Sequence, residues 1–169
     1  MTPIVSEELV EQAWRRVGAL EPSEVLTLQN RSGRFQPELV GFVLGFTSRM
    51  SPESVGIALY EMLVLFEMFQ RVPATSFGKI KDRAIMKLWR SNRQLSAELL
   101  VHEFDRDLMT EFVARSSEPA ALQYVIEALV EVQEESGDLP PEEVADILAI
   151  HKTVIDALHS AATRRAPGS

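Results

Sequence analysis

The sequence predicts one all-α domain, a bundle of six to eight helices around a central antiparallel helical hairpin. Apolar residues recur at intervals of three and four along most of the chain, and serine, proline or acidic residues mark repeated helix starts. No stretch alternates apolar and polar residues as a half-buried strand does. With 169 residues and 46% hydrophobic content, the chain has the size of one domain. We expect this domain to cover residues 1–163 and the tail 164–169 to be disordered.

Three helices are predicted before the most apolar segment. Apolar spacing predicts a helix over Glu7–Ala19 and a shorter helix that begins at Pro22. A third helix begins near Pro37 and carries Gly41 and Gly45 one turn apart. Because each glycine weakens a helix by roughly 1 kcal/mol relative to alanine, we expect another helix to pack closely against the glycine side.

The segment Ser51–Val72 is predicted to be the central helix, because it is apolar on nearly every side. Ser51 is suited to cap its start, and Pro73 ends it. A short connection joins it to the preceding helix, so we expect these two helices to form the antiparallel hairpin at the centre. Glu61 is the one acid in the middle of the broad apolar arc.

Four further helices are predicted after Pro73. The first is basic and amphipathic and is expected to kink or restart at Ser91. The next covers Leu95–Arg115, another begins near Pro119, and the last follows Pro140.

The net charge of −8 argues against affinity for nucleic acid or anionic lipid. The charge is unevenly spread. Residues 77–94 contain six basic residues and one acid, whereas residues 118–159 contain ten acids and one lysine. We therefore expect an electrically polarised molecule.

The composition indicates a cytoplasmic protein. The chain has no cysteine, which excludes disulfides, thiolate zinc sites and cysteine nucleophiles and fits a reducing compartment. The N-terminal stretch is acidic where a signal peptide is basic, and neither of the two most apolar runs is long enough to span a membrane. We expect no membrane association.

No motif identifies a reaction. The chain has no G-x-S-x-G sequence, and Gly41, Gly45 and Gly56 fall inside predicted helices instead of a phosphate-binding loop. Glu98 and His102 share a helix face, but a single such pair is typical of a solvated surface. We therefore predict no catalytic residue, cofactor or metal site.

Two sets of polar residues are candidates for function. Glu61 and His151 fall on apolar faces and are expected to point inward. A basic stripe is predicted on the helix after Pro73, and it consists of Lys79, Arg83, Lys87 and Arg90.

These residues support two hypotheses. The first is a non-enzymatic protein-interaction module that forms a homo-oligomer, with a dimer as the favoured state, through the basic stripe and the last helix. The alternative is a small-molecule-binding protein or enzyme with a pocket near Glu61 and His151. A buried Glu61 needs a cationic or hydrogen-bonding partner, or must be protonated. We expect an arginine, a lysine or His151 to supply the partner.

Overall fold

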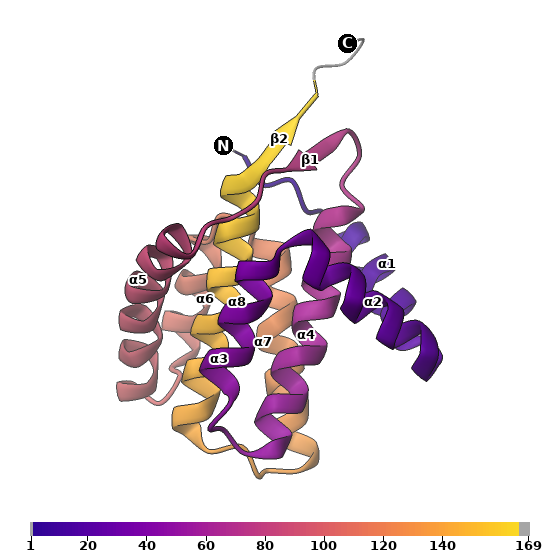
Figure 1. The fold of residues 1–169 in the computed structure, drawn as a ribbon. Coiled ribbons are helices and arrows are strands. Elements are labelled where there is room, and N and C mark those ends of the chain that lie inside the picture. Colours follow the sequence, from indigo (N-terminus) through magenta and orange to yellow (C-terminus); the bar gives the residue numbers. More distant parts are fainter. Residues whose placement is uncertain (1, 166–169) are drawn as a thin grey trace.

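The computed structural model describes residues 2–165, which form eight α-helices and one pair of short antiparallel strands (Figure 1). The predicted all-α fold of six to eight helices is therefore confirmed. In chain order the elements are α1 (Glu7–Gly18), α2 (Pro22–Phe35), α3 (Pro37–Thr47), α4 (Pro52–Gln70), β1 (Thr75–Phe77), α5 (Asp82–Val101), α6 (Arg106–Ala114), α7 (Pro119–Glu135), α8 (Pro141–Ala161) and β2 (Ala162–Arg164). No helix within residues 2–165 is long and apolar enough to cross a membrane.

Local residues set the helix starts. The Ser6 side chain accepts a hydrogen bond from the Leu9 N–H at the start of α1, and Ser51 accepts from the Ser54 N–H at the start of α4. Proline occupies the first turn of α2, α3, α4, α7 and α8. At that position the missing N–H of proline would have no partner within the helix in any case.

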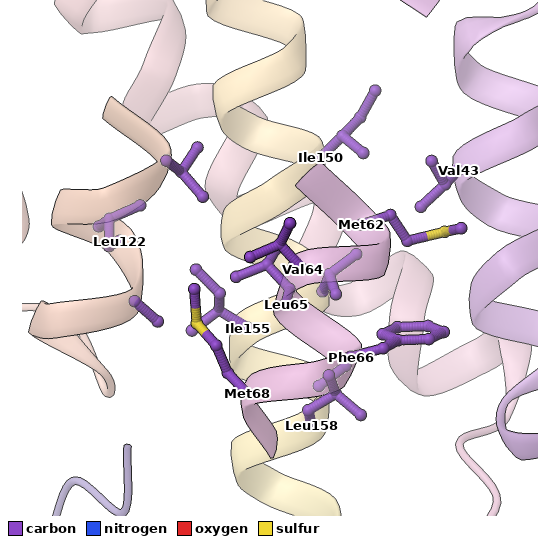
Figure 2. Packing of buried hydrophobic residues seen from close by; sticks show 14 of the residues in the cluster. Val43, Met62, Val64, Leu65, Phe66, Met68, Leu122, Ile150, Ile155 and Leu158 are labelled. Carbon is purple, nitrogen blue, oxygen red and sulfur yellow. The ribbon is translucent and has the colours of Figure 1, made fainter. Parts of the chain in front are cut away.

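The centre of the domain is formed by α4 and α8. Every residue of α8 from Ile147 to Ile155 is buried, because α3, α4, α5 and α7 all pack against this helix. Figure 1 shows α8 running through the middle of the bundle. In Figure 2 α4 crosses in front of α8, and Leu65 and Met68 of α4 belong to the same buried cluster as Ile155 and Leu158 of α8. The predicted hairpin partner α3 contacts α4 after a short turn, but α8 is the helix that shares the centre with it.

The expected close packing on the glycines of α3 is wrong. Gly41 and Gly45 are exposed, and a Cβ built on either would meet nothing within 4 Å beyond the helix itself. The same helix turns Leu39 and Phe42 into the core. Large apolar side chains bury more area than glycine, so they take the inner side and leave the glycines facing outward.

The helix does not restart at Ser91, as the sequence suggested it could, since α5 continues to Val101. Asn92 is buried, and its amide nitrogen donates to Thr153 Oγ1 and Asp156 Oδ2, both at 3.1 Å. This contact with α8 keeps two weak helix formers inside the helix. Tertiary contacts override local propensity here.

The chain breaks instead after α5. The N–H of Phe104 donates to the Leu99 carbonyl at 2.7 Å, and the N–H of Glu103 donates to the Leu100 carbonyl at 3.0 Å. These two bonds form a Schellman motif, which requires a left-handed residue just beyond the helix. Glu103 has a φ of 52°, so a glutamate takes the position that usually holds glycine.

Both ends of the described part, residues 2–165, are bonded to the bundle. β2 pairs with β1, and the N–H of Arg165 donates to the Ala74 carbonyl at 2.8 Å. The prediction of a disordered tail over residues 164–169 therefore does not hold for Arg164 and Arg165, while residues 166–169 lie outside the described part. Sequence patterns did not indicate these strands because each has only three residues.

A buried carboxylate holds the N-terminal segment. Glu118 accepts from the Ile4 N–H at 2.6 Å and from the Val5 N–H at 3.1 Å. Its Oε1 also lies 3.1 Å from Nδ1 of His159 on α8. All the polar capacity of Glu118 is thus used in joining the first residues to α7 and α8.

Candidate ligand-binding cleft

A cleft of about 640 Å3 lies between α1, α4 and α7. Carboxylates dominate its polar lining, and they belong to Glu7, Glu11, Glu61, Glu127, Glu131 and Glu135. No lysine or arginine of the described chain lines it. The cleft therefore presents negative charge to anything that enters.

Helical spacing places these acids in rows. Glu127 and Glu131 are four residues apart on α7 and Glu135 follows after four more, so they share one face of that helix. Glu7 and Glu11 have the same spacing on α1. The helices present these rows toward one cleft.

Aromatic and aliphatic side chains complete the lining. Trp14 is 48% exposed and Tyr60 is 38% exposed, while Tyr124 is half-buried. Val10 of α1 and Ile57 of α4 add apolar surface. Aromatic faces beside carboxylates favour cations, since both present negative electrostatic potential.

Glu61 is the most unusual of the lining residues. It is only 3% exposed, and its Oε2 is buried without a hydrogen-bond partner in the described part of the chain. Burial is the main reason that its pKa rises from 4.5 to about 7. The nearby Tyr124 hydroxyl opposes this rise, and the negative charge of Glu131 adds to it. The carboxyl is therefore poised to ionise near neutral pH.

The two tyrosines respond to the same carboxylate. Burial and, after it, the negative charge of Glu61 raise the pKa of Tyr60 and of Tyr124. Both hydroxyls therefore keep their protons and can act as hydrogen-bond donors in the cleft.

Glu67 lies six residues further along α4 and is a buried glutamate that, unlike Glu61, has cationic partners. It is equally buried, at 4% exposed, yet it pairs with Arg16 at 2.9 Å and Arg71 at 3.1 Å. Arg31 lies 3.5 Å from its other oxygen. Residues 2–165 provide no such ion pair for Glu61. The expected lysine or arginine partner of Glu61 is therefore absent from the described chain.

His151 does not supply the missing partner. Its Nε2 lies 3.0 Å from the Ala58 carbonyl, and because a carbonyl only accepts, Nε2 carries the hydrogen. Its Nδ1 is buried without a partner among the described residues, and burial lowers its pKa to about 4. His151 does not line the cleft. Of the two residues that the sequence suggested as one polar site, only Glu61 lines this cleft.

The predicted basic stripe is divided as well. Lys79 precedes α5, and its ammonium donates to the Arg34 carbonyl and, at 2.8 Å, to the Phe35 carbonyl at the end of α2. Arg83, Lys87 and Arg90 lie exposed on α5 and take part in no ion pair within residues 2–165. α5 contributes nothing to the cleft.

Sequence reasoning missed most of the cleft. It singled out Glu61, but not Trp14, Tyr60 or Tyr124, which come from three different helices. The repeated four-residue spacing of acids was a usable signal. It could not show that the two rows face each other, because that depends on how α1 and α7 pack.

Comparisons with protein-family models, with curated proteins and with solved structures give no match to this chain. Among the described residues, no three histidine, aspartate or glutamate side chains gather in a way that could hold a metal ion. The cleft itself is therefore the basis for an inference about function.

Proposed function

We propose that the protein binds a small organic cation in the cleft between α1, α4 and α7, with the Glu61 carboxylate as the anionic partner. The observation that carries this proposal is the buried Glu61 Oε2, which has no hydrogen-bond partner in the described chain and belongs to a residue lining a cleft free of basic side chains. This proposal develops the small-molecule hypothesis drawn from the sequence, but it gives His151 no role in binding.

The energetics favour such a ligand. An unpaired buried carboxylate costs several kcal/mol, and an incoming cation removes that cost. The exposed indole of Trp14 offers a face for a cation–π contact. The glutamates around Glu61 raise the local concentration of cations at the entrance.

The dimensions favour a small ligand. The volume of about 640 Å3 lies within the range of small-molecule sites, roughly 300–1,000 Å3. A whole helix is about 10 Å wide, so it would rest on the rim above the buried Glu61. An ammonium group on a slender stem can reach the carboxylate.

Isothermal titration calorimetry tests the proposal with a panel of primary, quaternary and aromatic ammonium compounds. We expect at least one of them to bind wild type, and Glu61→Gln to weaken that binding at least tenfold while the circular dichroism spectrum is unchanged. Glu98→Gln is the matched control, because it removes one exposed acid outside the cleft. Equal affinity of wild type and Glu61→Gln would refute the role of Glu61.

We propose self-association as a second candidate function, supported by the outer face of α3. Gly41 and Gly45 leave this face open, while Leu44 is 49% exposed and Phe46 is 40% exposed. Two copies of α3 crossing in opposite directions would place Gly41 of one copy near Gly45 of the other, and small residues permit such close approach. Such a dimer would use α3 and not the surfaces expected from the sequence, the basic stripe and the last helix, because α8 is largely buried inside the bundle.

Native mass spectrometry and light scattering test this second candidate. We expect wild type to be a dimer at micromolar concentration and Phe46→Glu to be a monomer with the same helical content. A wild-type protein that remains monomeric up to about 100 μM would refute self-association.

A further inference from the structure

The geometry points to a linear polyamine as the cation held in the cleft between α1, α4 and α7. This inference rests on the proposed function and names the chemical class of its ligand. It depends on how the carboxylates are distributed along the cleft, on what lies between them, and on the depth of Glu61.

The carboxylates follow the helix axes. With a rise of 1.5 Å per residue, acids four residues apart are separated by about 6 Å along the axis. Glu127, Glu131 and Glu135 repeat this separation along α7, and Glu7 and Glu11 repeat it on α1. An extended four-carbon segment separates two amine nitrogens by a similar length. The rows therefore match a chain of ammonium groups and do not match a compact cation.

Most of these acids are free to accept a ligand. Glu11 pairs with Arg15 at 2.6 Å, and Glu127 accepts from the Gln123 amide at 3.0 Å. Glu7, Glu131 and Glu135 make no side-chain hydrogen bond or ion pair among residues 2–165. A monoamine bound at Glu61 would leave these three charges without a partner.

The apolar lining suits the carbon segments of a polyamine. Val10, Ile57, Ala128 and Val132 lie among the acids on all three helices of the cleft. Methylene groups placed on this surface leave water, which favours an alkyl chain over a hydrated inorganic cation. The absence of a metal-binding group of acids within the described chain agrees with this preference.

Glu61 fixes one end of the ligand. Because only 3% of this residue is exposed, a slender terminal primary ammonium is the group that suits the carboxylate, while the more exposed Tyr60 and Trp14 line the same cleft. The remaining amines then extend along the α7 row toward Glu131 and Glu135. A lysine side chain of a peptide carries the same terminal group, so the experiment must separate these two sources.

Calorimetric titration of the whole chain at 150 mM salt, about physiological ionic strength, compares butylamine, 1,4-diaminobutane, spermidine, a trilysine peptide and Mg2+. We expect affinity to rise with the number of amines and spermidine to bind at least tenfold tighter than butylamine, trilysine and Mg2+. Glu61→Gln should weaken every amine. The double variant Glu131→Gln and Glu135→Gln should reduce the advantage of spermidine over butylamine to below threefold.

A second double variant, Glu98→Gln with Glu103→Gln, removes the same charge away from the cleft and should retain the full advantage. Tight butylamine binding that equals spermidine binding, and that Glu61→Gln abolishes, would overturn the polyamine inference and leave the proposed function standing. Tighter binding of trilysine than of spermidine would assign the site to a peptide and would also overturn the polyamine inference. If both double variants weaken spermidine binding equally, binding depends on net charge and not on the cleft, and the polyamine inference is overturned. No binding of any amine would overturn both proposals.

Discussion

Replacing Glu61 with glutamine should stabilise the ligand-free protein above pH 7 and change its stability little at pH 4.5. Burial raises the pKa of Glu61 from 4.5 to about 7, so the native state holds this proton more tightly than the unfolded chain does. The destabilising effect of ionisation is therefore absent below about pH 4.5, grows between pH 4.5 and 7, and is complete above pH 7. At 1.36 kcal/mol per pH unit, it reaches about 3 kcal/mol.

His151 hides this effect in the wild type. Burial lowers its pKa from 6.5 to about 4, so the unfolded chain takes up this proton first, and stability falls as the pH drops from 6.5 to 4. The contribution of Glu61 has the opposite sign over nearly the same range. We therefore expect a flat profile for wild type between pH 4.5 and 6.5, and a loss of stability on acidification for Glu61→Gln.

Urea denaturation followed by circular dichroism measures both profiles from pH 4.5 to 8.5. Glu98→Gln is the control and should run parallel to wild type, because Glu98 is exposed. If Glu61→Gln proves less stable than wild type at pH 8, the carboxylate has a cationic partner and the reasoning fails. A difference that does not vary with pH would show that the pKa of Glu61 is not raised.

Four further outcomes are expected. Amine affinity should fall by up to about tenfold per pH unit below pH 7, because binding requires the ionised Glu61. Titration calorimetry from pH 5 to 8.5 measures this dependence, and an affinity that does not change with pH would contradict the role of Glu61. In the monomeric protein, Gly45→Ala should raise the free energy of unfolding by about 0.5–1 kcal/mol in urea denaturation, since the added Cβ meets nothing within 4 Å beyond the helix itself; a loss of stability in the monomer would contradict this. Lys79→Glu should lower the melting temperature by several degrees, because the two carbonyl contacts of the lysine ammonium are lost. Arg83→Glu should change the melting temperature by no more than about one degree, because Arg83 is exposed, and equal effects would contradict the division of the basic stripe. Glu67→Gln should cost about 1–3 kcal/mol in urea denaturation, because three half-exposed arginines lose their anion, and no change would show that solvent screens them fully.

The sequence predicted those features that depend on neighbours along the chain. Ser6 and Ser51 marked helix starts, and helical spacing put Glu61 on an apolar face, where the structure has it buried. Features that depend on packing were not predictable. Glu67, for example, is buried beside arginines from α1 and α2, and the contact depends on how those helices pack against α4.

The same limit explains the errors in helix length and in the core. Asn92 stays helical only because of Thr153 and Asp156, which lie about sixty residues away in sequence. At the end of α5, Glu103 takes a left-handed conformation that glycine usually adopts. Because no glycine stands there, the sequence did not indicate the end of the helix. The segments that became α4 and α8 are both rich in apolar residues, and composition alone could not show that they pair.

The order of the helices along the chain has a consequence for biosynthesis. α8 fills the centre of the bundle, yet the ribosome makes it after α1 to α7. Until α8 emerges, the surfaces of α4, α5 and α7 that pack against it stay uncovered. The early helices therefore cannot complete a core during translation, and nascent chains that stop short of α8 should be held by chaperones or degraded.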